Sequence, residues 1–415
     1  MTLEVTQAIH KRSSCRLCNS SKLSAEIFLP ETVIADHYSA SPGHYVRKYP
    51  LDLFQCQDCG HVQTLDVLPL NLLFSSDYTY KPSRNQKLID HFVGYAQSVE
   101  SNLGRSPKKS FDIGSNDGLF LSILRDNYKT EVLGIDPADS AVAYATSSGV
   151  NTIHSFFTES EAKKIRAEHG LFDHVSANNV YAHNDDLNGL TAGITHLLED
   201  GGIFTFEISY LCCIVEKSLI GTIFHEHLSH HSLLPLISFL ESHNLYLFDA
   251  FYVDTQGGAL VCSASKGHSK PFTRSLENLL DHERSVHATS FSYMSTFRAN
   301  LINLRNTFSN LLDSQISSNS RIVGYGAARS ANLLIEFFQL TNCLDVVLDD
   351  NPEKVDKFIS NTDIPIHSAS SFKFTSNDIV IPLAWIHSQA ITERLLDRKE
   401  GLTVVSFYPE PVVFS

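Results

Sequence analysis

Short apolar runs that end in glycine, asparagine or acidic residues recur through the middle of the chain and predict buried strands. These runs cover residues 109–113, 131–136, 172–177 and 202–207. A helix is expected to begin near Leu119, directly after the first run. Buried strands that alternate with helices are typical of an α/β fold with an open parallel sheet.

Two further apolar runs near the C-terminus, at residues 321–325 and 344–349, predict a second, Rossmann-like lobe. Residues 270–318 are polar with few helix breakers, so we expect a helical connector between the lobes. A chain of 415 residues is too long for one ordinary core. We divide it into residues 1–75, 76–268 and 269–415.

Composition and charge narrow the class of protein. Hydrophobic residues make up 43% of the chain and charged residues 19%, which is normal for a folded protein. The formal net charge is −14 without a long run of Lys or Arg, so a nucleic acid is not an expected partner. The chain contains neither a long apolar run nor an apolar N-terminal leader, so we expect a cytoplasmic protein without membrane contact, as a monomer or weak dimer.

Four of the eight cysteines form two CxxC pairs, Cys15/Cys18 and Cys56/Cys59. Each pair can direct two thiolates at one tetrahedral ion, and Gly60 relaxes the tight turn after the second pair. The 37 intervening residues exceed the usual ribbon spacing, and isolated CxxC pairs can be redox-active. Two matched pairs favour a structural zinc site with four cysteine ligands.

A glycine turn follows the first buried strand, in the sequence DIGSNDG at residues 112–118. Glycine at 114 and 118 lets the backbone approach a ligand, and the helix that follows offers free N–H groups. Asn116 occupies the position of the middle glycine of GxGxxG, which leaves room for a nucleoside without phosphates. Asp136 ends the next strand about twenty residues later, where a carboxylate binds ribose hydroxyls; its alternative role is a turn before Pro137.

Polar side chains also follow the third run, in the sequence NNVYAHNDD at residues 178–186. The carboxyl end of a parallel strand faces the ligand crevice, which favours His183 as a site residue, although a helix-capping histidine is the alternative. An aromatic loop at residues 74–84 contains Tyr78, Tyr80 and Lys81, which either pack or line a sugar or phosphate pocket.

The densest chemistry lies in the sequence TIFHEHLSHHS at residues 222–232, where four histidines and one glutamate fall within seven residues. The HExxH zinc motif fails because Ser229 occupies the second histidine position. Thr222 and Ile223 favour extended chain, in which His225 and His227 share one face. These residues either bind a catalytic metal or include one imidazole that acts as a base, and we prefer the base because a nucleoside-type lobe already supplies the electrophile.

The C-terminal glycine turn has the sequence GYGAAR at residues 324–329. Arg329 stands at the third glycine of a dinucleotide motif, so this signal is weak. We expect Tyr325 or Arg329 to face a cleft shared by the two lobes.

These motifs, in this order, resemble the SAM-dependent sugar C-methyltransferases, which methylate a carbon beside the ketone of nucleotide-linked keto-deoxysugars. The matching segments are the two CxxC pairs, the tyrosine loop, DIGSNDG, NVYAH at 179–183, HEH at 225–227 and GYGA at 324–327. The resemblance covers essentially the whole chain. It implies a zinc-binding N-terminal domain, a class I methyltransferase core and a C-terminal lobe that helps to bind the sugar nucleotide.

The resemblance also implies roles for individual residues. His227 would be the base, assisted by Glu226, His183, His225 and Tyr78. S-adenosyl-L-methionine (SAM) would contact Gly114, Ser115, Asn116, Gly118, Asp136, Asn178 and Asn179. The substrate would contact Tyr80, Lys81, Phe224, His230, Tyr325 and Arg329. One structural zinc ion per chain would be held by Cys15, Cys18, Cys56 and Cys59.

Some positions depart from the family pattern. Phe224 stands where a tyrosine is usual, the family's HGGSxR becomes QGGALV at 256–261, and Ile386 replaces an asparagine after Trp385. These departures affect the substrate side of the site. They leave open a relative that acts on a different keto substrate, a non-catalytic SAM-fold binding protein, and a second metal held by the extra histidines.

Overall fold

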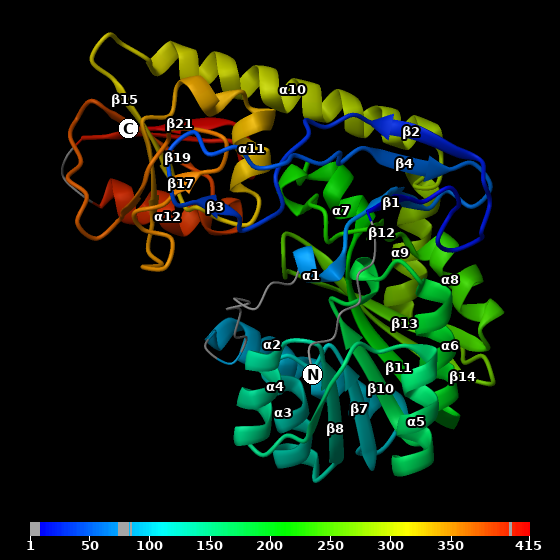
Figure 1. The fold of residues 1–415 in the computed structure, drawn as a ribbon. Helices are drawn as coiled ribbons and strands as arrows, with labels where there is room; N and C mark the ends of the chain where they lie inside the picture. The colour runs from blue at the N-terminus through cyan, green and yellow to red at the C-terminus, as the bar shows by residue number, and fades with distance from the viewer. Residues whose placement is uncertain (1–8, 74–82, 84, 398–400) are drawn as a thin grey trace.

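The structure is a computed structural model that describes residues 9–73, 83, 85–397 and 401–415. The expected loop contacts Tyr78, Tyr80 and Lys81 lie outside these residues. Figure 1 shows a central lobe, a C-terminal lobe and N-terminal strands that lie over the central lobe, beside the C-terminal lobe. No helix in the described part of the chain is long and apolar enough to cross a membrane.

The central lobe is built on a seven-stranded sheet in the order β13-β14-β11-β10-β7-β8-β9. Its strands are β7 (Lys109–Ile113), β8 (Glu131–Asp136), β9 (Thr152–His154), β10 (Phe172–Asn178), β11 (Leu198–Ser209), β13 (Leu245–Val253) and β14 (Ala259–Lys266). The first five are parallel, and β14 runs antiparallel to both of its neighbours. Ile113 pairs with both Ile135 and Ala177, so the carboxyl ends of β7, β8 and β10 meet at one edge.

Helices cover both faces of this sheet (Figure 1). On one face lie α2 (Gln86–Leu103), α3 (Leu119–Tyr128) and α4 (Asp139–Ser147), and on the other lie α5 (Glu159–His169), α6 (Leu187–Leu197) and α8 (Leu233–Ser242). Helix α2 begins at Asn85, whose side chain accepts a hydrogen bond from Lys87 N, and ends at Gly104 in the left-handed conformation. Apolar helices on both faces explain why the strands read as continuous apolar runs.

The N-terminal segment forms a four-stranded sheet in the order β12-β5-β4-β2. Its strands are β2 (Leu23–Ile27), β4 (Leu53–Cys56), β5 (Val62–Thr64) and β12 (Ser229–His230). Strand β12 directly follows the HEH sequence, so the central lobe contributes one edge of this sheet. Two further N-terminal strands, β1 (His10–Lys11) and β6 (Asp66–Val67), pair with each other. The segment also contains β3 (Tyr38–Ser39) and α1 (Leu70–Leu73).

The C-terminal lobe confirms the expected second Rossmann-like unit. Its six-stranded sheet has the order β18-β16-β15-β19-β20-β21, of which only β21 is antiparallel. Its elements are β15 (Arg321–Tyr325), α11 (Ala331–Phe337), β16 (Val346–Asp349), β18 (Ile366–Ser368), β19 (Asp378–Pro382), α12 (Ser388–Leu396), β20 (Thr403–Ser406) and β21 (Val412–Phe414). Strand β17 (Phe358–Ile359) pairs with β3 and so joins this lobe to the N-terminal segment.

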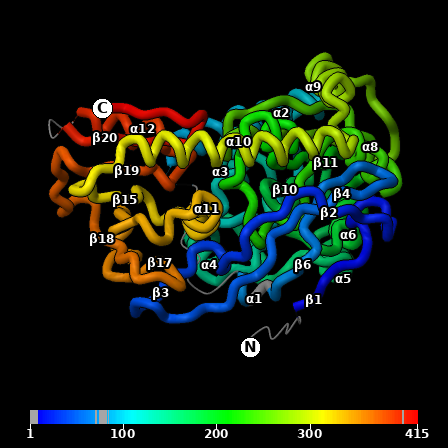
Figure 2. The backbone as a smooth tube through the Cα atoms, turned by 90° about the horizontal axis from the view of Figure 1, so that it is seen from above, coloured from blue at the N-terminus to red at the C-terminus, as the bar shows by residue number. Residues whose placement is uncertain are grey.

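The expected helical connector consists of α9 (Arg274–Ser285) and α10 (Phe291–Gln315). Helix α10 carries a buried apolar stripe: Tyr293, Met294, Phe297, Leu301, Leu304, Phe308 and Leu312. The sequence interpretation of a polar connector therefore overlooked the apolar face that α10 buries against its neighbours. Seen from above, α10 crosses the molecule from the central lobe to the C-terminal lobe (Figure 2), and it contacts α7 (Leu211–Glu216), β2 and β20.

Candidate active site

The glycine turn after β7 adopts the backbone conformation that its sequence predicts. Gly114 and Gly118 have φ angles of +69° and +78°, a region that glycine favours. A Cβ atom at Gly114 would lie 2.5 Å from Cγ2 of Val180, so the turn packs closely against the segment after β10. Helix α3 begins directly after the turn, the arrangement that presents N–H groups to a ligand.

Asp136, the last residue of β8, is held beside this turn. Its carboxylate accepts hydrogen bonds from the backbone N–H groups of Asn116 and Ala138, both at 2.9 Å. Burial raises the carboxyl pKa, and these two hydrogen bonds oppose the rise. The carboxylate is thus fixed at the crevice edge of the sheet, where a ribose ligand is expected.

Two side chains at this edge contain buried polar atoms that have no hydrogen-bond partner among the described residues. They are Nδ2 and Oδ1 of Asn178, at the end of β10, and Oγ of Ser115 in the glycine turn. Buried amide and hydroxyl groups are normally hydrogen-bonded. A nucleoside cofactor offers complementary donors and acceptors, so these residues fit SAM. The neighbouring Asn179 donates its N–H to the carbonyl of Glu207 at 3.0 Å.

The HEH sequence forms a turn, so the expectation of extended chain was wrong. The N–H of His227 donates to the carbonyl of Phe224 at 2.8 Å, which reverses the chain direction. His225 and His227 therefore do not share a face. The Nε2 atom of His225 lies 3.2 Å from the carbonyl of Tyr49, in the N-terminal segment. His225 thus contacts the neighbouring lobe rather than His227.

Leu228 directly follows this turn, and both its N–H and its carbonyl form hydrogen bonds with residues distant in the sequence. Its N–H donates to the carbonyl of Ala182 at 2.8 Å, and its own carbonyl accepts from Thr64 N at 3.0 Å and from the Arg16 guanidinium at 3.1 Å. These tertiary hydrogen bonds override the extended preference of Thr222 and Ile223. They bring His227 to His183, because His183 directly follows Ala182.

The imidazole of His227 is held in one tautomer. Its Nδ1 lies 2.6 Å from the carbonyl oxygen of Thr222. A carbonyl only accepts hydrogen bonds, so Nδ1 carries the proton and Nε2 carries a lone pair. The ring lies edge-on to His183 with centroids 4.9 Å apart, and 3.9 Å from the ring of Phe224.

Both imidazoles are neutral at physiological pH. Burial lowers the pKa of His227 to about 4, and the nearby Arg329 contributes to that decrease. Burial also lowers the pKa of His183 well below its ordinary value, with smaller contributions from His227 and Arg329. A neutral imidazole that has a fixed N–H and a free lone pair can accept a proton.

Arg329 of the C-terminal lobe connects Glu226 to the N-terminal segment. The buried carboxylate of Glu226 pairs with the guanidinium of Arg329. Arg329 also pairs with Asp36 of the N-terminal segment at 3.0 Å. Burial raises the pKa of Glu226, and the charge of Arg329 opposes this rise. The guanidinium also lies over the ring of Phe224, 5.4 Å from its centroid.

The other expected substrate residues occupy different surroundings. His230 lies in β12, where its side chain is 2% exposed, and its Nε2 has no hydrogen-bond partner among the described residues. The hydroxyl of Tyr325 contacts Asp350 and Arg394 within the C-terminal lobe. The structure therefore brings Arg329 to the HEH turn, whereas the side chain of Tyr325 contacts residues of its own lobe.

The metal alternative for the histidines receives no support. Groups of side chains able to hold a metal occur in the described part of the chain, but none includes a histidine of the HEH turn. The four cysteines do form such a group, with their sulfur atoms within 4.8 Å of one another. The sulfur atoms of Cys15 and Cys59 are 3.6 Å apart, and those of Cys18 and Cys56 are 3.5 Å apart. Four thiolates around zinc require separations of roughly this size.

One buried acid near the cofactor edge was missed in the sequence. The carboxylate of Glu207, near the end of β11, lies 2.6 Å from Nε2 of His91 and accepts a hydrogen bond from Thr255 Oγ1 at 2.6 Å. Its side chain is 2% exposed. A single acid within the apolar run at residues 202–208 was the signal that could have identified it.

The parallel sheet, the glycine turn after its first strand and the acid after its second define a class I methyltransferase lobe. A zinc-type cysteine cluster and a second Rossmann-like lobe flank it. The same division appears in matches to three family models: "Putative zinc binding domain" at residues 15–74, "Methyltransferase domain" at 85–283 and "C-methyltransferase C-terminal domain" at 254–407.

Individual proteins are also similar to this chain. C-methyltransferase NovU of Streptomyces niveus is 27% identical over 371 residues, which cover 88% of each chain. The N-methyltransferase NodS of Bradyrhizobium japonicum, solved with S-adenosyl-L-homocysteine, is 14% identical and covers 47% of this chain and 94% of its own, with a TM-score of 0.36. A S-adenosylmethionine-dependent methyltransferase of Clostridium acetobutylicum is 12% identical and covers 43% of this chain and 92% of its own, with a TM-score of 0.36.

Together the three models match residues 15–74 and 85–407, so the chain combines a zinc-binding domain, a methyltransferase domain and a C-methyltransferase C-terminal domain. SAM and zinc are thereby confirmed as its cofactors at the level of the methyltransferase and zinc-binding domains.

Proposed function

We propose that this C-methyltransferase methylates the carbon beside the ketone of a nucleotide-linked keto-deoxysugar, and that His227 removes the proton from that carbon. The order of motifs along the chain supports the substrate class. The observation that carries the proposal is the single tautomer of His227, whose Nδ1–H donates to Thr222 O at 2.6 Å and whose Nε2 is left as the basic atom. We also propose lobe boundaries near residues 75 and 268.

The ketone acidifies the neighbouring C–H bond, and Nε2 of His227 accepts that proton. When bound, SAM would supply the electrophilic methyl group, and its sulfonium would leave as the thioether S-adenosyl-L-homocysteine. A donor near the ketone oxygen would stabilise the enolate, and His183 lies beside the His227 ring. The low pKa of His227, about 4, keeps this base unprotonated at neutral pH.

Glu226 and Arg329 position the base rather than exchange protons with the substrate. Their ion pair fixes the turn that precedes Leu228, while His225 fastens the same turn to Tyr49. Phe224 lies against both His227 and Arg329, so it forms part of the wall near the reacting carbon. A tyrosine at this position would offer a hydroxyl to the substrate, and Phe224 does not.

The substrate wall continues into the C-terminal lobe. A Cβ atom at Gly221 would lie 2.2 Å from Nε1 of Trp385, and one at Gly257 would lie 2.9 Å from Cη2 of the same indole. The QGGALV segment and Trp385 therefore pack together. We propose that this contact, together with Phe224, sets the choice of sugar.

The test is mass spectrometry of products after incubation with SAM and a panel of keto-sugar nucleotides. We expect one substrate to gain a methyl group on carbon and to exchange its α-proton in deuterium oxide. His227→Ala should abolish both reactions while SAM still binds. Full turnover in His227→Ala would disprove the role of this base. Binding of SAM without α-proton exchange on any keto sugar would instead support a non-catalytic protein or a different keto substrate.

A further inference from the structure

Three side chains with metal-binding atoms converge outside the site described above. Cys212 and Glu216 lie one helical turn apart on α7, and His282 reaches them from α9. Their ligand atoms all lie within 4.8 Å of one another. Nε2 of His282 is already 2.6 Å from a carboxylate oxygen of Glu216.

The thiol of Cys212 is buried, whereas the other two groups reach solvent. Cys212 is 1% exposed, and the side chains of Glu216 and His282 are 43% and 42% exposed. A metal ion could therefore enter from the solvent side. The two exposed side chains can rotate to meet it without disturbing the core.

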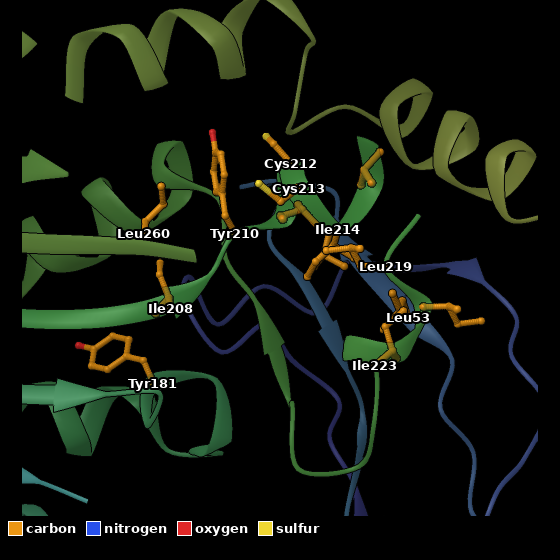
Figure 3. Close-up of a cluster of buried hydrophobic side chains, with 14 of the residues drawn as sticks. Leu53, Tyr181, Ile208, Tyr210, Cys212, Cys213, Ile214, Leu219, Ile223 and Leu260 are labelled. Carbon is orange, nitrogen blue, oxygen red and sulfur yellow. The ribbon is translucent and has the colours of Figure 1, made fainter. Parts of the chain in front are cut away.

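A second observation concerns Tyr210, which precedes α7. Its hydroxyl is buried and has no hydrogen-bond partner among the described residues. Figure 3 shows this hydroxyl and the sulfur of Cys212 extending toward the same side. The Cys212 thiol and the Glu283 carboxylate lie beside this phenol, and a thiolate at Cys212 would be a stronger acceptor for it than the thiol. The hydroxyl of Tyr293, on α10, is a donor to Glu216 at 3.4 Å.

We propose that Cys212 Sγ, a Glu216 carboxylate oxygen and His282 Nε2 bind a second zinc ion, with water as the fourth ligand. Thiolate, imidazole and carboxylate are all zinc ligands, and a tetrahedral site requires donor atoms roughly 3.3–3.8 Å apart, so a contraction of about 1 Å suffices. The Cys212 proton is released on binding, and zinc replaces the His282–Glu216 hydrogen bond.

This site would fasten α7 to the connector helix α9. Helix α7 ends nine positions before His225, and the adjoining α10 crosses to the C-terminal lobe. The inference concerns residues distant from the four-cysteine group in sequence and does not depend on the identity of the substrate. Its failure would therefore leave the proposed methyl transfer intact.

The full-length protein should be saturated with zinc, freed of loose metal by gel filtration and analysed by mass spectrometry for zinc per chain. We expect two ions per wild-type chain. His282→Ala should reduce this to one, and because its side chain is half-exposed the variant should fold. Cys212→Ala should likewise retain one ion, whereas the matched neighbour Cys213→Ala should retain two.

Cobalt(II) substitution provides a second measurement. A site with one thiolate should add a weak sulfur-to-cobalt charge-transfer band to that of the four-cysteine site, and His282→Ala should remove only this addition. One zinc ion per wild-type chain would overturn the proposal. So would two ions retained in both His282→Ala and Cys212→Ala.

Discussion

Arg329 and Glu226 form an ion pair across the boundary between the C-terminal and central lobes. The carboxylate is 4% exposed and the guanidinium 36%, and the two residues are separated by 103 positions in the chain. Glu226 directly precedes the proposed base. This contact therefore links the docking of the C-terminal lobe to the geometry of the HEH turn.

Arg329→Gln should destabilise the protein more than Glu226→Gln, because only the first leaves a buried carboxylate without its partner. We expect a loss of about 2 kcal/mol in the free energy of unfolding, below the range for fully buried pairs since Arg329 is partly exposed. Chemical denaturation of the two single variants and the double variant checks this. Adding Glu226→Gln to Arg329→Gln should restore part of the stability. Strict additivity would contradict the coupling.

Asp136→Asn should weaken SAM binding without removing the fold of the sheet. A hydrogen bond to a charged group contributes about 1.5–3 kcal/mol, so the dissociation constant should rise roughly 10- to 150-fold. Isothermal titration calorimetry with SAM measures this change. Asp139→Asn is the matched control, because this exposed acid lies three residues further on. Equal effects in the two variants would remove Asp136 from the cofactor site.

The glycine turn, the position of Asp136 at the end of a strand and the cysteine group could be predicted from the sequence because each depends on a short local motif. DIGSNDG, Asp136 and the two CxxC pairs each occupy a short segment whose geometry follows from residue type. The HEH turn was not predictable in this way. Thr222 and Ile223 favour a strand, but Leu228 bonds to Ala182 and Thr64, which are distant in sequence. The pairing of Glu226 with Arg329 could not be predicted for the same reason, because the two residues are 103 positions apart in the chain.

Buried histidines should make stability fall on mild acidification. Burial lowers the pKa of His174 and His230 to about 3 and of His225 and His231 to about 4. The unfolded chain takes up protons near pH 6.5, whereas the folded chain does not until about pH 4. The free energy of unfolding therefore decreases as pH falls from 6.5 to 4, by up to about 1.4 kcal/mol per pH unit for each such histidine.

Thermal and urea unfolding at pH 7.5, 6.0 and 5.0 measures this slope. His174 lies within the central sheet, with Ser110 Oγ 2.5 Å from Nδ1 and Thr205 Oγ1 2.8 Å from Nε2. His174→Gln should reduce the slope, since glutamine can retain a hydrogen bond but does not titrate. The exposed His268→Gln is the control and should leave it unchanged. A slope that is the same in His174→Gln as in the wild type would refute the explanation.

Loss of zinc from the four-cysteine site should impair methyl transfer at a distance. Cys18→Ser removes one ligand from the ion that joins the two CxxC turns, and β4 and β5 depend on those turns. Strand β5 pairs with β12, where Ser229 and His230 follow the HEH turn. The N-terminal sheet should loosen, and the turn should lose its support from Thr64 and Arg16 at Leu228. Because the glycine turn and Asp136 lie in the central lobe, SAM should still bind.

Hydrogen exchange of residues 53–64 and 229–230, measured together with SAM affinity and turnover, separates these effects. Cys343→Ser is the control, because Cys343 belongs to neither group of possible metal ligands among the described residues. Unchanged turnover in a zinc-depleted Cys18→Ser protein would show that the N-terminal sheet does not support the base.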